Sequence, residues 1–300
     1  MQGGSAASGH LAAAATILVW GTTYISTKVL LEDYAPIDIL FTRFLIGFFV
    51  LSLACRTRVR FRRWREERLY MAAGLCGVTL YFLFENIALT YTYASNVAMV
   101  MASAPMLTAV AARLFLRSER IGWSFVAGFF CAAAGIGLIS FSSVEEMHLN
   151  PFGDFLAVMG ALTWAVYSIF TRKIAAFGET SAEATRHIFF WGLVFMGPAL
   201  YAFDFRWGLA RLADPVNLGN LLFLGVGASA LCFATWTYSV KTLGAVKTSA
   251  YIYASPVITV ACAVVVLGET ITPLMGAGIV LTMTGLFLSQ WFPVLKERWA

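Results

Sequence analysis

Three ionisable side chains stand inside long apolar runs of the chain: Lys28, Arg43 and Glu85. A charge is costly at the centre of a bilayer, so each is a candidate for binding a ligand or another charge. Together they could supply partners for both the carboxylate and the amine of a zwitterion. Local explanations stay open, because Lys28 is one helical turn from Glu32 and Arg43 could bond helix-end carbonyls or Asp38. We expect Lys28 and Arg43 to lie at the outer rim of a substrate site.

Tryptophan and tyrosine also occur deep within apolar runs, where each needs a partner for its polar atom. Their rings can stack on flat apolar groups and can bind an ammonium group through the ring face. Interfacial aromatic belts are the competing explanation, above all for Trp236. The predicted substrate site consists of Trp20, Tyr24, Tyr81, Glu85, Asn86, Trp164, Tyr167, Trp236 and Tyr251.

Composition places these residues in a membrane protein. The 300 residues are 60% hydrophobic and 12% charged, with mean hydropathy +0.77. Soluble domains carry about 25% charged residues, so a polytopic chain in a lipid bilayer is predicted. The net charge of +5 is concentrated in "CRTRVRFRRWREER", which favours a cytoplasmic loop beside a span over a nucleic-acid partner.

Ten apolar segments are long enough to cross a membrane. Of the 21 Lys and Arg, 17 fall on one side if the N-terminus is cytoplasmic, and four on the other, so both termini are predicted inside. The predicted fold is therefore all-α and multi-pass. The ten predicted spans are 11–31, 37–55, 69–90, 95–116, 121–141, 153–170, 184–203, 220–238, 245–267 and 272–292.

The two halves of the chain resemble each other. The stretch "LVWGTTYISTKVL" matches "LTWAVYSIFTRKI", with Trp20 over Trp164, and the other matched residues are Pro105 with Pro256, Glu119 with Glu269 and Gly135 with Gly285. The halves are predicted as five-helix repeats over 11–141 and 153–292. Because five is odd, the second repeat enters the membrane from the opposite side. Inverted repeats are typical of secondary transporters. The predicted function is therefore the transport of a small organic solute.

Two features of the repeat bear on motion and packing. Pro105 and Pro256 fall within spans four and nine, where they are expected either to act as paired hinges or to form static kinks. Small-residue runs such as "GLCG", "GVGAS", "AAAGIGL" and "GAGIV" indicate closely approaching helices.

The repeat, the early Trp-Gly of span one and the "P…E" element of spans four and nine resemble the drug/metabolite transporter superfamily in its EamA-type branch. Members of this branch often have Gly before the Glu of that element. The second half of this chain keeps the Gly in "LGET", whereas the first half has "LRSE". Within the branch the chain is most similar to YddG-type exporters. That resemblance implies alternating-access export of amino acids, aromatic ones above all, and of related metabolites across a bacterial inner membrane.

The sequence contains no Walker A, GxSxG or HExxH motif, so no enzyme activity, metal or cofactor is predicted. The five cysteines are expected to be small buried hydrophobes. A carrier of nucleotide sugars or drugs, a channel and a membrane-embedded enzyme are the alternatives. No partner protein is indicated.

Overall fold

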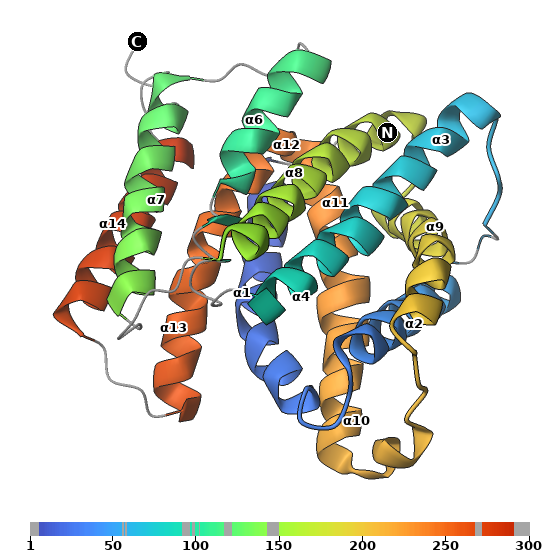
Figure 1. The fold of residues 1–300 in the computed structure, drawn as a ribbon. Coiled ribbons are helices and arrows are strands. Elements are labelled where there is room, and N and C mark those ends of the chain that lie inside the picture. The colour runs from blue at the N-terminus through green and yellow to red at the C-terminus, as the bar shows by residue number, and fades with distance from the viewer. Residues whose placement is uncertain are drawn as a thin grey trace. The chain divides into compact units, whose positions relative to one another are not determined.

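The computed structural model describes residues 6–55, 57, 59–91, 97, 100–101, 103–116, 122–142, 150–267 and 272–290. Within those ranges every regular element is a helix and none is a strand (Figure 1). Four described helices are long and apolar enough to cross a membrane: Pro36–Ala54, Trp64–Ala88, Pro151–Phe177 and Pro215–Leu243. The all-helical class is confirmed, whereas the count of ten spans and the side of the termini stay predictions.

The chain divides into two compact units. The first contains Met1–Phe82 and Phe170–Leu243, and the second contains Leu83–Ile169 and Gly244–Ala300. Each unit therefore draws helices from both halves of the sequence.

The first unit is built from three long helices and two helices that contain π-helical segments. Local sequence explains where its later helices begin: Thr180 and Glu183 form a capping box before α9, and Asp214 caps α10 ahead of Pro215. Its elements are α1 (Ala6–Leu30), α2 (Pro36–Ala54), α3 (Trp64–Gly74), η1 (Leu75–Leu80), η2 (Ala175–Phe177), α9 (Ser181–Ala202), η3 (Leu209–Ala213), α10 (Pro215–Leu222), η4 (Phe223–Leu231) and α11 (Cys232–Leu243).

The second unit has an apolar core that includes Ala109, Ile136, Ile169, Tyr253 and Leu286. The side chain of Asn150 accepts the backbone N–H groups of residues 152 and 153 and so starts α8. Its elements are α6 (Ala104–Phe115), α7 (Trp123–Ser142), α12 (Ala245–Ser249), η5 (Ala250–Tyr253), α13 (Ala254–Leu267) and α14 (Pro273–Gln290), and α4 (Tyr81–Tyr91) and α8 (Pro151–Ile174) have most of their residues in it.

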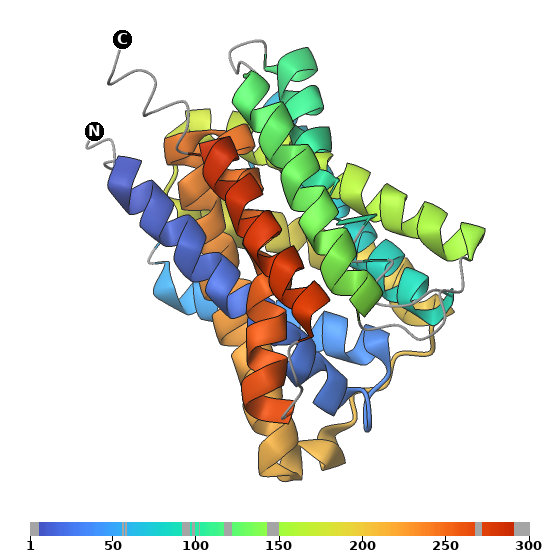
Figure 2. The same ribbon diagram turned by 90° about the vertical axis from the view of Figure 1, so that its left-hand side faces the viewer.

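Helices α7 and α14 pack side by side through glycines (Figure 1, Figure 2). A Cβ built on Gly135 would lie 2.6 Å from the carbonyl oxygen of Gly278, and one on Gly285 would lie 2.5 Å from that of Gly128. Gly128 and Gly278 are separated by 150 residues, as are Gly135 and Gly285. The contact is thus reciprocal and antiparallel, which is the pattern of a local two-fold axis between equivalent helices.

The first unit contains a similar pair of contacts. Gly47 of α2 approaches Gly225 of η4, and Gly192 of α9 approaches Gly74 at the end of α3. Each contact lies beside or within a π-helical segment, η1 in one half and η4 in the other. The close approach predicted from the small-residue runs is confirmed at these glycines and at those of α7 and α14.

Candidate substrate site

An aromatic cluster in the first unit brings together two of the predicted site residues. The ring of Trp20 lies 5.2 Å from that of Trp236 and 5.4 Å from that of Phe233. The indole N–H of Trp20 donates to the carbonyl oxygen of Ala228 at 2.9 Å. Ala228 belongs to η4, where the backbone departs from the α-helical pattern, and this bond anchors Trp20 of α1 on that segment.

Phenylalanines extend this cluster to α2 and α9. The ring of Phe44 lies 5.6 Å from Phe233, 4.9 Å from Phe189 and 5.2 Å from Phe82. The predicted site residue Tyr81 contacts Phe82 at 4.8 Å. Nothing in the spacing of the 25 phenylalanines of the chain distinguishes these four from the others.

Arg43 is the cation of the aromatic cluster. Its side chain is buried, and its guanidinium lies 5.4 Å from the ring centre of Phe44 and 5.2 Å from that of Phe82. Its Nε–H donates to the hydroxyl of Ser229 at 2.9 Å. A planar cation held on aromatic rings can bind a carboxylate through paired N–H groups, which is the chemistry required for an amino acid.

The second unit holds the other described aromatic residues of the predicted site. Trp164 and Tyr167 lie on α8, are buried, and have ring centres 5.1 Å apart. Tyr251 of η5 is also buried.

Two polar residues of the predicted site lie on α4. Glu85 is buried and Asn86 is partly buried, next to an apolar cluster that contains Phe84, Ile87 and Ala88. The structure therefore gathers Trp20, Trp236, Arg43 and Tyr81 in the first unit, and it places Glu85, Asn86, Trp164, Tyr167 and Tyr251 in the second. The side chains of Tyr24 and Lys28 lie outside the described residues, although their backbone belongs to α1.

The two predicted hinge prolines both stand near the start of a regular helix. Pro105 is the second residue of α6, and Pro256 is the third residue of α13, directly after the 3-10 segment η5. Each proline therefore marks a change of helical geometry, in keeping with the missing N–H of a proline.

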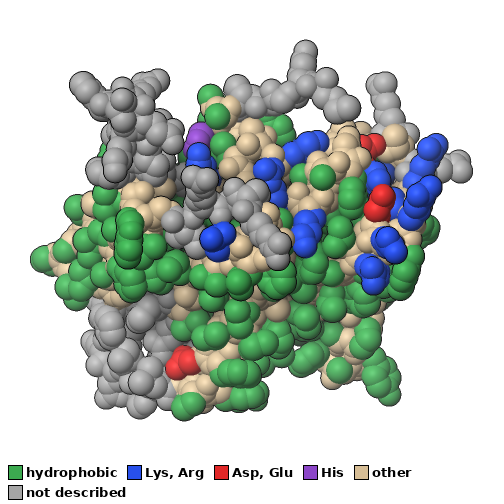
Figure 3. All heavy atoms as spheres, turned by 90° about the horizontal axis from the view of Figure 1, so that it is seen from above, with side chains coloured by type: hydrophobic (Ala, Val, Ile, Leu, Met, Phe, Trp, Pro, Cys, Tyr) green, Lys and Arg blue, Asp and Glu red, His purple; other side chains and the backbone are tan. Residues whose placement is uncertain are grey.

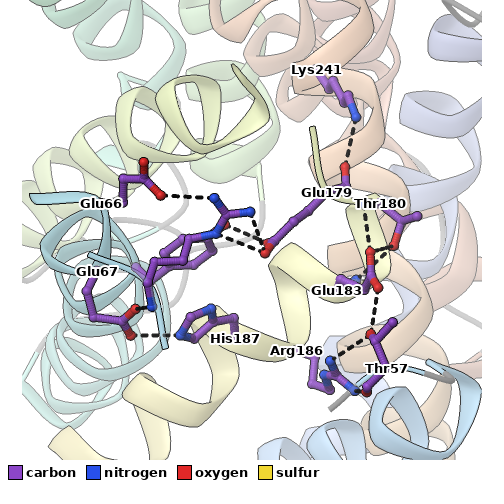
Figure 4. Close-up of polar contacts among 11 residues, drawn as sticks. Thr57, Glu66, Glu67, Glu179, Thr180, Glu183, Arg186, His187 and Lys241 are labelled. Atoms are coloured by element: carbon purple, nitrogen blue, oxygen red, sulfur yellow. Dashed lines mark hydrogen bonds and ion pairs between the residues drawn. The ribbon is translucent and has the colours of Figure 1, made fainter. Parts of the chain in front are cut away.

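A polar network in the first unit was not predicted from the sequence (Figure 4). Glu67 and His187 are both buried, and Glu67 Oε1 lies 2.7 Å from His187 Nε2. Glu67 also accepts the indole N–H of Trp191 at 2.6 Å and the backbone N–H of Arg62 at 2.8 Å. This one carboxylate therefore joins α3, α9 and the segment that precedes α3.

Glu179 connects the same region to further elements. Its carboxylate accepts from the guanidinium of Arg62 at 2.8 Å and from the hydroxyl of Tyr70 at 2.6 Å, and its backbone oxygen accepts from Lys241 at 2.9 Å. Burial would lower the pKa of Arg62, but its bonds to Glu66 and Glu179 outweigh that cost and raise the pKa. The network joins residues that are far apart along the chain, from Arg62 to Lys241. Periodicity and local spacing therefore could not reveal it.

Comparison with known proteins bears on what this fold does. Residues 7–141 and residues 151–291 of this chain each match the EamA-like transporter family. A solved crystal structure with 22% identity superimposes with a TM-score of 0.79 over 98% of this chain and 99% of the other, which shows a shared fold.

Named relatives are about one quarter identical. An uncharacterized transporter of Archaeoglobus fulgidus is 26% identical over 93% of this chain and 96% of its own length. A probable terminal-alkyne amino-acid exporter of Streptantibioticus cattleyicolor is 25% identical over 91% of this chain and 90% of its own. A probable amino-acid metabolite efflux pump of Salmonella typhimurium is 25% identical over 91% of each chain. Because both halves match the family, this chain belongs to the EamA-like transporter family and contains two EamA repeats.

Proposed function

We propose that this chain is a secondary transporter that exports amino acids, aromatic ones above all, together with related small metabolites, by alternating access. The proposal includes ten spans, cytoplasmic termini and a place in a bacterial inner membrane. Two relatives named as amino-acid exporters or efflux pumps support the substrate class. The likeness to YddG-type exporters supports the preference for aromatic side chains.

The observation that carries the proposal is the placement of Arg43 on the aromatic cluster of the first unit. An aromatic amino acid offers a carboxylate to a guanidinium and a flat ring to the faces of Trp20, Phe44 and Phe233. A nucleotide-sugar carrier would require several converging cations. Among the described residues, Arg43 is the one cation whose guanidinium lies over rings of this cluster.

The other predicted residues stay candidates for binding the substrate. Glu85 is a candidate partner for an ammonium group, because it is a buried carboxylate within the apolar helix Trp64–Ala88, three residues before its end. Trp164 and Tyr167 are candidates for contact with an aromatic ring. Tyr24, Asn86, Trp236 and Tyr251 remain candidate lining residues, and Lys28 a candidate rim charge.

Counterflow of labelled phenylalanine into proteoliposomes that contain only this protein tests the proposal. We expect saturable uptake that tryptophan and tyrosine compete. Arg43→Gln removes a bond between the guanidinium and the substrate carboxylate. We expect it to lower uptake at subsaturating substrate about tenfold or more, and we expect a similar loss in Trp20→Ala. The matched control is Trp123→Ala, because Trp123 is 88% exposed and lies outside the aromatic cluster.

The result that would exclude the aromatic assignment is absence of counterflow from protein that is monodisperse and folded. Equal losses in Trp20→Ala and Trp123→Ala would instead exclude the aromatic cluster as the site. Transport that does not saturate would favour a channel.

The hinge role of the prolines has its own test. In Pro105→Ala combined with Pro256→Ala, we expect counterflow to slow several-fold, because alanine permits regular helix where the chain now changes geometry. Pro198→Ala is the control, since Pro198 stands inside α9. Unchanged transport and an unchanged conformational equilibrium in the double variant would show that the prolines form static kinks.

A further inference from the structure

The segment around the start of α3 mixes arginines with acids in the sequence, but the structure separates them. Glu66 accepts from Arg62 at 2.9 Å, and Glu67 is buried against His187 and Trp191. The nearest acids of other elements are also engaged, Glu179 by Arg62 and Tyr70, and Glu183 by Thr57 and Thr180. The carboxylates of this region are therefore used in contacts inside the first unit.

The arginines that remain point to solvent. Arg60, Arg63, Arg65 and Arg68 are all exposed, and none of them has a hydrogen bond or an ion pair with another described residue. Trp64, between them, is 65% exposed. We call these five residues the arginine patch. Figure 3, seen from above, shows exposed Lys and Arg side chains.

The position of the arginine patch limits what could cover it. Trp64 is the first residue of Trp64–Ala88, a helix apolar and long enough to cross a membrane. The patch therefore lies where such a helix would leave the hydrocarbon, which is the depth of lipid headgroups and of interfacial tryptophans. A guanidinium presents paired N–H groups that match the oxygens of a phosphate.

We propose that the arginine patch binds the phosphodiester headgroups of anionic phospholipids at the membrane surface. The internal bonds of Glu66, Glu67, Glu179 and Glu183 keep nearby carboxylates from neutralising the four guanidinium groups. Each basic residue near an anionic surface strengthens binding by about fivefold. This binding is independent of the transported solute, so it stands or falls separately from the proposed export of amino acids.

The test uses the full-length protein purified in a neutral detergent and titrated with dioleoyl-phosphatidylglycerol or, separately, with dioleoyl-phosphatidylcholine. We expect phosphatidylglycerol to raise the thermal unfolding temperature and to remain bound in native mass spectrometry, and phosphatidylcholine to do neither. Salt at about 1 M, where the Debye length is about 3 Å, is expected to weaken the effect. Inorganic phosphate at the same concentration as the lipid is expected to leave the unfolding temperature unchanged.

Variants test whether the binding of phosphatidylglycerol depends on the arginine patch. Glutamine at Arg60, Arg63, Arg65 and Arg68 together should weaken the apparent affinity for phosphatidylglycerol by about tenfold or more. Lysine at the same positions should keep most of it, which also shows that the site tolerates substitution. The matched control replaces four exposed cations outside the patch, Arg113, Arg206, Arg211 and Lys247, with glutamine and so removes the same charge.

Two outcomes would overturn the proposal. One is an equal loss of phosphatidylglycerol binding in the control variant, which would mean a response to net charge alone. The other is a folded glutamine variant that binds phosphatidylglycerol as tightly as the unmodified protein.

Discussion

Alanine at Gly135 or at Gly285 will separate α7 from α14 and destabilise the second unit. The added Cβ would lie 2.6 Å from the carbonyl oxygen of Gly278 in the first case and 2.5 Å from that of Gly128 in the second, where real Cβ contacts are essentially never under 3.0 Å. Backbone atoms are among the obstructing atoms at both positions, so rotating a side chain does not relieve the overlap and the helices must move apart. We expect a loss of about 2–4 kcal/mol in the free energy of unfolding, measured by denaturation in detergent micelles.

The same two helices supply the controls. A Cβ on Gly137 or on Gly276 would meet nothing within 4 Å. Gly137→Ala and Gly276→Ala remove the same backbone freedom, and each lies two residues from a glycine of the contact. Each should change the free energy of unfolding by about 0.5 kcal/mol or less. If Gly135→Ala proves as stable as Gly137→Ala, the close packing of α7 on α14 does not determine stability.

Alanine at Glu67 will have the largest effect expected in the first unit. It removes the acceptor of the His187 ring at 2.7 Å, of the Trp191 indole at 2.6 Å and of the Arg62 backbone N–H at 2.8 Å, all at a residue that is 4% exposed. Buried donors left without an acceptor keep their desolvation cost, so we expect a loss of about 3–5 kcal/mol. The measurement is again the free energy of unfolding in micelles.

The neighbouring acid is the control for Glu67. Glu66 is more exposed, with a side-chain exposure of 37%, and its ion pair is with Arg62, four residues earlier. Exposed pairs of this kind contribute about 1 kcal/mol or less, so Glu66→Ala should be nearly neutral. Equal destabilisation by Glu66→Ala and Glu67→Ala would show that the general charge of α3 matters rather than the buried contacts.

The helical class and the repeat could be predicted from the sequence because short stretches of it are enough to recognise both. Apolar runs of about 20 residues indicate spans, and Pro105, Gly135 and their counterparts half a chain later indicate duplication. The glycine runs also indicated close packing, which Gly74, Gly135, Gly225 and Gly278 confirm. The π-helical segments were not predicted, since their sequences "LCGVTL" and "FLGVGASAL" read as ordinary apolar helix.

The candidate site was predictable only in part. Trp20 and Arg43 were selected because polar atoms within an apolar run are costly. Their partners Ala228 and Ser229 are small residues 208 and 186 positions away, and nothing in a single sequence assigns them to a tryptophan or an arginine. The Glu67–His187 contact could not be predicted for a related reason: the two residues are 120 positions apart, and the charges around Glu67 indicate an exposed loop.

The two π-helical segments take equivalent places in the two halves of the chain. Gly74 and Gly225 take equivalent places in their contacts, 151 positions apart, and the bounds of η1 moved by 151 positions fall at 226–231, within η4. The same departure from α-helical geometry therefore recurs in both repeats, each time beside a close glycine contact of the first unit.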